Sequence, residues 1–172
     1  GQIKAVRWTR TLEPEVRAAP EGLIDPWLKT ISFWNGEKKL AALHYYAVHP
    51  SSYEDLRVTP DFTGLARARR QAEDGGVPHF YFTECAGNIT AGKYNDGAPE
   101  NRVLFTERIL RALRASEEEM QRAPMERCEW RAVPLSLPPR ADVSEAELHA
   151  TLHNGTLPTK ARSRAAFMLA YR

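Results

Sequence analysis

Two short polar segments carry the residue types that could do chemistry in this chain. The first, His49-Pro50-Ser51-Ser52, follows a run of apolar and aromatic residues, and the second, Cys85 to Thr90, follows another such run. In open α/β sheets, ligands bind beyond the carboxyl ends of the strands. We therefore take these two segments as the candidate site.

His49 could be a metal ligand, a general base or a loop histidine that only forms hydrogen bonds. Neutral imidazole is the commonest metal ligand in proteins. His44 lies five residues earlier, and an odd spacing on a strand sends two side chains to opposite faces. We therefore interpret His44 as a core or sheet-face histidine. His79 has no partner at ligand spacing, whereas His149 and His153, four residues apart, could share a helix face.

The second segment has the composition of a loop that could bind an oxyanion. Gly87 and Gly92 allow the backbone to turn sharply or to approach a ligand closely. Asn88 adds an amide and Thr90 adds a hydroxyl. Backbone N–H groups of such a loop could stabilise an oxyanion. A tight turn after a strand explains the same residues equally well.

The cysteines and nearby acids give weaker signals. Two cysteines without a CxxC motif cannot form a metal knuckle, and a disulfide between Cys85 and Cys128 is left open. Cys85 could be a nucleophile with His49 as its base. A buried, unreactive thiol is the simpler interpretation of a cysteine beside a strand. Asp61 is most simply a helix N-cap.

The elements that position these segments are predicted from periodicity and turn residues. Strands at 30–34 and 39–48 flank Asn35-Gly36, a strong hairpin signal. The second strand is almost continuously apolar, so it should lie inside the sheet. The further elements that we expect are strands at 77–83 and 128–137, and helices at 60–73, at 99–122, from 144 and at 158–171. This order predicts an α/β fold with a mixed β-sheet flanked by helices.

Composition is that of an ordinary globular protein. With 172 residues, 42% of them hydrophobic and 27% charged, the chain fits a single domain over 1–172. A net charge of +2 argues against a nucleic-acid partner. Residues 1–28 contain three prolines and predict an extended arm that needs a larger body to lie against. We therefore expect a fragment of a longer protein.

Three stretches together resemble the neutral/alkaline non-lysosomal ceramidases, most closely their bacterial ceramidase-like branch. They are Val48-His49-Pro50-Ser51-Ser52 with the apolar residues before it, Asp61-Phe62-Thr63-Gly64, and Phe80-Tyr81-Phe82-Thr83-Glu84-Cys85-Ala86-Gly87-Asn88-Ile89-Thr90. Residues 25–31 and 91–97 fit the same branch, so the similarity covers about residues 22–115.

The resemblance implies a partial ceramidase-type catalytic domain and a zinc-dependent hydrolase of linear amide bonds that acts on an N-acyl lipid such as ceramide. That family holds one zinc ion with two histidines, a glutamate and a tyrosine. His49 matches the second histidine, and the other three ligands find no match in this chain. Thr90 matches a serine close to the scissile amide, while backbone N–H groups near Gly87 and Asn88 could stabilise the oxyanion. Glu84 stands where glycine is more usual.

Two other interpretations stay open beside the hydrolase. A non-catalytic ceramidase-like domain could bind a lipid or a partner without a complete zinc site, and a different hydrolase could use Cys85 with His49. The resemblance further implies a role in sphingolipid metabolism, an extracytoplasmic location (secreted, periplasmic or cell surface) and peripheral membrane contact. With three ligands missing, we expect the chain alone to be inactive, its zinc site completed by residues outside it. The acyl substrate and the oligomeric state are not indicated.

Overall fold

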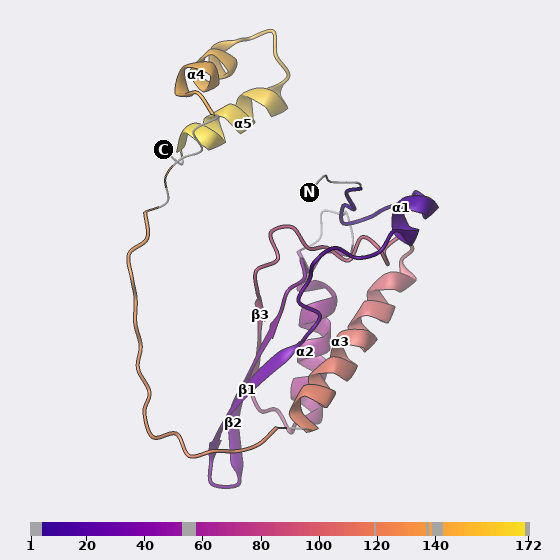
Figure 1. Ribbon diagram of the computed structural model, residues 1–172, viewed down its shortest axis with the longest axis vertical. Helices are drawn as coiled ribbons and strands as arrows, with labels where there is room; N and C mark the ends of the chain where they lie inside the picture. The colour runs from indigo at the N-terminus through magenta and orange to yellow at the C-terminus, as the bar shows by residue number, and fades with distance from the viewer. Residues whose placement is uncertain (1–4, 53–57, 119, 137, 139–142, 171–172) are drawn as a thin grey trace. The chain divides into compact units, whose positions relative to one another are not determined.

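The computed structural model describes residues 5–52, 58–118, 120–136, 138 and 143–170. The chain packs as two compact units, Gly1–Ala123 and Pro124–Arg172 (Figure 1). A single domain that is a fragment of a longer catalytic domain stays a prediction, because two compact units can belong to one domain.

A three-stranded mixed sheet forms the centre of the first unit. Strands β1 (Lys29–Asn35) and β2 (Lys38–Tyr46) form an antiparallel hairpin, and β3 (His79–Thr83) pairs in parallel with β2. Gly36 has a φ of 56°, which the tight turn between β1 and β2 requires. The predicted hairpin and the central position of its second strand are confirmed, as is the general α/β class.

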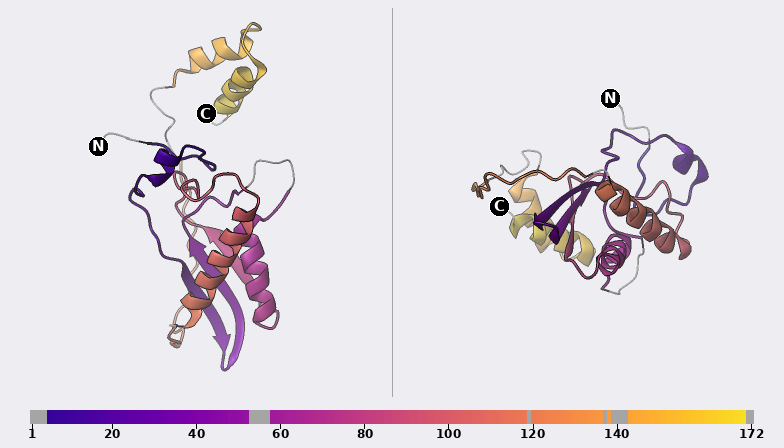
Figure 2. Two further views of the ribbon diagram at one scale, coloured as in Figure 1. Left: turned by 90° about the vertical axis from the view of Figure 1, so that its right-hand side faces the viewer. Right: turned by 90° about the horizontal axis from the view of Figure 1, so that it is seen from below.

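Two helices, α2 (Asp61–Glu73) and α3 (Glu100–Glu118), cover one face of this sheet (Figure 2). They contact each other, while α2 also contacts β3 and α3 contacts β1. Phe62 of α2 meets Phe105 of α3 edge to face, with ring centroids 5.4 Å apart. Leu110 and Leu113 of α3 are fully buried beside them. Both helices were predicted, the first from the residues at its two ends and the second from its apolar stripe, although the second ends earlier than expected.

The opposite face of the sheet stays open among the described residues. The strands alternate, so that Ile31, Phe33, Phe80 and Phe82 keep between 38% and 52% of their surface exposed. Tyr45 stacks on Phe82 with ring centroids 5.2 Å apart. These side chains form an exposed apolar surface that α2 and α3 do not cover, since both helices pack on the other face.

From residue 5 onward, the N-terminal arm has no regular structure apart from the five-residue helix α1 (Pro14–Ala18). Asn95, which is fully buried, ties the arm to the loop that follows β3. Its side-chain amide donates to the backbone carbonyl of Thr9 at 2.8 Å, and its backbone carbonyl accepts from the N–H of Thr11 at 2.9 Å. The arm therefore lies against the loop that carries the candidate site.

The second unit contains two mutually packed helices, α4 (Glu145–His153) and α5 (Thr159–Ala170). The side chain of Ser144 accepts a hydrogen bond from the N–H of Glu147 at 3.3 Å, which confirms the predicted cap. No described helix has the length and apolar character needed to cross a bilayer.

The predicted strand at 128–137 is wrong over its described part. Residues 128–136 form no strand, and Trp130, Val133 and Leu135 are 93%, 83% and 78% exposed. Alternating apolar residues favour a strand only where a neighbouring strand supplies pairing and side-chain contacts. The alternation in this segment does not by itself provide such a neighbour.

Candidate functional site

The two polar segments lie side by side, just beyond the ends of β2 and β3. The parallel pairing of these strands continues into an isolated bridge between His49 and Thr90. The N–H of His49 donates to the carbonyl of Ile89 at 3.0 Å. Parallel neighbours end at the same edge of a sheet, and so the loops that follow them meet. The two segments that the sequence analysis takes as the candidate site therefore lie at one location.

His49 is held in one orientation and one tautomer. Its Nδ1 atom lies 3.2 Å from the carbonyl oxygen of Ala86. A carbonyl only accepts hydrogen bonds, so Nδ1 carries the hydrogen and Nε2 of the neutral ring carries the lone pair. The side chain is exposed, and within the described part of the chain nothing bonds to Nε2. Metal-binding histidines are commonly fixed in this way, by donation of the other N–H to a backbone carbonyl.

Asp61 fixes the segment that follows His49. Its carboxylate accepts hydrogen bonds from the backbone N–H of Ser52 at 2.8 Å, from the Ser52 hydroxyl, and from the N–H of Phe62 at 2.7 Å. Asp61 is the first residue of α2 rather than its N-cap, which is Pro60, so the predicted cap is wrong. Its φ of 49° is costly for a residue other than glycine. The carboxylate bonds compensate for this cost and join the loop to the helix.

Gly87 and Asn88 are the central residues of a tight turn. The turn is closed by the N–H of Ile89, which donates to the carbonyl of Ala86 at 3.1 Å. Gly87 and Asn88 are exposed, and no described residue accepts their N–H groups. The two donors are therefore open to a ligand, as an oxyanion role requires. That role stays a prediction.

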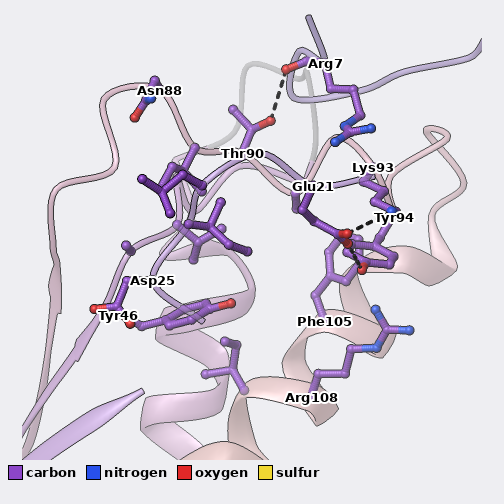
Figure 3. A pocket seen from close by; sticks show the side chains of 18 of the residues that line it. Arg7, Glu21, Asp25, Tyr46, Asn88, Thr90, Lys93, Tyr94, Phe105 and Arg108 are labelled. Carbon is purple, nitrogen blue, oxygen red and sulfur yellow. Dashed lines mark hydrogen bonds and ion pairs between the residues drawn. The ribbon is translucent and has the colours of Figure 1, made fainter. Parts of the chain in front are cut away.

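The Thr90 hydroxyl donates its hydrogen to backbone carbonyls of the N-terminal arm. The oxygen lies 3.5 Å from the carbonyl of Arg7 (Figure 3). It also lies 3.1 Å from the carbonyl of Trp8, and it accepts from the N–H of Gly92 at 3.2 Å. At Gly92, a Cβ atom would lie 1.8 Å from the Trp8 oxygen. Only glycine allows this close approach, and so Thr90 and Gly92 together seat the arm.

A cavity of about 680 Å³ opens beside this edge of the sheet (Figure 3). Asn88 and Thr90 line it on one side, while its apolar lining includes Val48, Phe62 and Ile109. His49 follows Val48 directly in the chain. A volume of this size and a largely apolar lining are typical of small-molecule sites.

Acidic side chains at the cavity are already paired. Glu21 accepts from the Tyr94 hydroxyl at 2.5 Å and from the Lys93 ammonium at 3.0 Å, and these hydrogen bonds lower the pKa of Glu21 to about 2. Asp25 binds the Lys29 ammonium at 2.5 Å, which lowers the pKa of that carboxyl. Neither carboxylate is left to attract a cation.

A second cluster of histidines lies under the helices and was missed from the sequence. His44 and His79 are 0% and 1% exposed, and His44 Nε2 lies 2.8 Å from His79 Nδ1. The outer nitrogens bond Thr30 Oγ1 at 2.8 Å and Asp74 Oδ2 at 2.9 Å. His44 is the core histidine that was predicted, and its partner is His79, which has no partner at ligand spacing along the sequence. The two are joined by the parallel register of β2 and β3, which spacing along the chain does not reveal.

The geometry around His44 and His79 could in principle hold a metal ion, because one ligand atom from each and one from Glu117 lie within 4.8 Å of one another. The Glu117 carboxylate, however, already forms ion pairs with Lys39 and Arg70. All four ring nitrogens are hydrogen-bonded as well. Burial and the neighbouring His79 lower the pKa of His44 to about 4. A saturated, charge-balanced network explains these residues without a metal.

The structure corrects the interpretation of Cys85. Both Cys85 and Cys128 are free, exposed thiols, whereas Cys85 was expected to be buried. The reason is that β3 ends at Thr83, so Cys85 already lies beyond the sheet. Glu84 next to it pairs with Lys29 at 3.2 Å, which balances the charge introduced where glycine was expected.

No family model, no curated protein and no solved structure matches this chain. The resemblance to ceramidases therefore stays a prediction, based on the three stretches named above.

Proposed function

We propose that this chain contributes to a zinc-dependent amidohydrolase of the neutral ceramidase type, which cleaves the amide bond of an N-acyl lipid. The observation that carries the proposal is the bridge between His49 and Thr90 beside an apolar cavity. It supports one site in which the His49 imidazole lies beside Thr90, and Thr90 and Asn88 line an apolar cavity.

His49 is the zinc ligand that the chain would supply. Its hydrogen bond to Ala86 fixes the tautomer that leaves Nε2 able to coordinate. No group of three ligand-type side chains in the described residues includes His49, so the further ligands must come from other residues or another chain. Zinc, when bound at such a site, lowers the pKa of a water molecule and polarises the amide carbonyl.

The other residues of the site bind and orient the substrate. The N–H groups of Gly87 and Asn88 would donate to the oxyanion that develops on the amide oxygen. Thr90 holds the arm over the cavity, and rotation of its hydroxyl away from Trp8 would let it donate to the substrate. The apolar cavity would exclude water from the acyl chain.

A non-catalytic lipid-binding domain is the second candidate. It is favoured by the hydrogen bond that commits the Thr90 hydroxyl to the arm. The lack of a complete ligand group around His49 among the described residues favours it as well. Under this alternative the cavity still holds an acyl lipid, but no zinc is bound.

The zinc content of the purified protein separates these candidates. With the ligand set completed by other residues or another chain, the hydrolase proposal predicts about one zinc per chain after dialysis against a weak chelator, lost in His49→Ala. A variant with both His149 and His153 replaced by alanine controls for metal held by the exposed pair on α4, and it should keep its zinc. A zinc-free protein that binds ceramide selects the second candidate, and a zinc-free protein that binds no lipid contradicts both.

A further inference from the structure

One of the arginines that line the cavity has no carboxylate partner among the described residues. Arg108 is exposed on α3, and its guanidinium lies 5.2 Å from the centre of the Tyr94 ring. No ion pair links Arg108 to any acidic side chain in the described part of the chain. The guanidinium therefore keeps its full positive charge at the cavity.

Arg7 adds a second unbalanced charge. Its guanidinium donates to three backbone carbonyls of the arm at 2.8–3.0 Å, those of Val16, Ala19 and Pro20. Carbonyl oxygens satisfy the donors but carry no net charge. In Figure 3 the Arg7 side chain extends toward the end of the cavity that Lys93 and Tyr94 occupy.

The charges of Arg108 and Arg7 both act electrostatically on the Tyr94 hydroxyl. The hydrogen bond from Tyr94 to Glu21 raises the pKa of the phenol, and the positive charges of Arg108 and Arg7 act against that rise. Lys93 at the same place is neutralised by Glu21 at 3.0 Å, and Asp25 is neutralised by Lys29. Since the charges within these two ion pairs cancel, the charges of Arg108 and Arg7 make this end of the cavity positive, next to the apolar lining of Val48, Phe105 and Ile109.

A positive end next to an apolar lining fits an amphiphile with an anionic head. We propose that the cavity selects N-acyl amides whose head group is a carboxylate, as in N-acyl amino acids, over neutral ones such as ceramide. The acyl chain lies on Val48, Phe105 and Ile109, and the carboxylate lies at Arg108, the guanidinium that has no backbone partner to give up. This inference rests on the proposed lipid-amide function and goes beyond it by naming the head group.

Two ligands that differ only at the head group test the preference. N-dodecanoylglycine and N-dodecanoylethanolamine share the acyl chain and the amide, but one ends in a carboxylate and the other in a hydroxyl. Calorimetric titration of the 172-residue chain, below the micelle concentration of both, should show about tenfold tighter binding of the glycine conjugate. Added salt should reduce this ratio, because the charge at the cavity mouth is partly exposed.

Arg108→Gln should remove the preference while leaving both ligands bound. Arg111→Gln is the matched control, since Arg111 is also exposed on α3 but does not line the cavity. This variant should keep the tenfold ratio. Equal binding of the two ligands by the unchanged protein, or an unchanged ratio in Arg108→Gln, would overturn the head-group preference alone. Failure of both ligands to bind would overturn the lipid cavity as well, while the zinc measurement on His49 decides the hydrolase proposal independently.

Discussion

The buried pair His44 and His79 and the exposed His49 differ in how many of their ring nitrogens have hydrogen-bond partners among the described residues. At the buried site, every ring nitrogen of His44 and His79 has a partner and the flanking charges are paired. Five residues after His44, His49 is exposed, with one nitrogen bonded and the other open. Saturated groups stabilise a fold, whereas an oriented group with an open position can bind a ligand. The comparison therefore indicates a structural role for the buried pair and supports the proposal that His49 binds a ligand.

The largest expected effect is at the buried site. His44→Ala removes one of the two hydrogen-bond partners of the Thr30 hydroxyl and leaves His79 Nδ1 unbonded. It also opens a cavity in the core, so the free energy of unfolding should fall by about 3 kcal/mol. The matched change His49→Ala removes an exposed ring and should cost about 0.5 kcal/mol or less. Urea denaturation of both variants measures the difference. Similar losses at the two positions would contradict the division of roles.

The seat of the arm gives the next effect. Gly92→Ala places a methyl group against the Trp8 carbonyl, so the arm must shift and about 2 kcal/mol of stability should be lost. Gly87→Ala in the same loop is the control, because its Cβ would meet nothing within 4 Å. Amide hydrogen exchange of residues 8–11 should accelerate in Gly92→Ala alone. Unchanged exchange there would show that the arm is not seated by this glycine.

Acid should weaken the buried site selectively. The pKa of His44 is about 4 in the folded chain and near 6.5 in the unfolded chain. Between these two values, the unfolded state binds a proton at His44 that the folded state does not bind. Stability should therefore fall by about 1.5 kcal/mol between pH 6.5 and 5, on top of other titrations. His44→Gln should lose this part of the pH dependence, and His149→Gln should retain it. Identical pH profiles for the unchanged protein and His44→Gln would rule out the buried histidine as the cause.

A smaller loss of stability than at His44 or Gly92 is expected at Thr90. Thr90→Val removes the hydroxyl that joins the arm and the N–H of Gly92, at a cost of about 1 kcal/mol. Thr90→Ser keeps the hydroxyl and should recover most of this loss. Thermal unfolding of the two variants decides whether the hydroxyl or the methyl group matters. Equal stability of both would leave the hydroxyl without the anchoring role.

Local signals carried the sequence predictions that the structure confirms. Asn35-Gly36 marked the hairpin, and Ser144 marked the start of α4. Pro60-Asp61 and Gly75-Gly76 marked the ends of α2, and an apolar stripe marked α3. The two loops of the site were found because polar residues followed predicted strands. Each of these features depends on neighbours within a few residues.

Features that depend on distant partners were missed. The pairing of His44 with His79 follows from the register of two parallel strands separated by a helix, and the partner of Thr90 comes from the arm more than eighty residues away. The segment at 128–136 has the alternation of a strand but no pairing partner among the described residues. Spacing along the chain contains none of this information.

Nuclear magnetic resonance of the histidine ring nitrogens tests the central comparison most directly. In a long-range proton–nitrogen spectrum at neutral pH, His49 should be the Nδ1–H tautomer, and one equivalent of Zn²⁺ should shift its Nε2 signal. The His44 and His79 signals should stay unchanged, because their nitrogens are already bonded inside the core. A response of the buried pair to zinc, with His49 unaffected, would contradict the proposal that His49 binds a ligand.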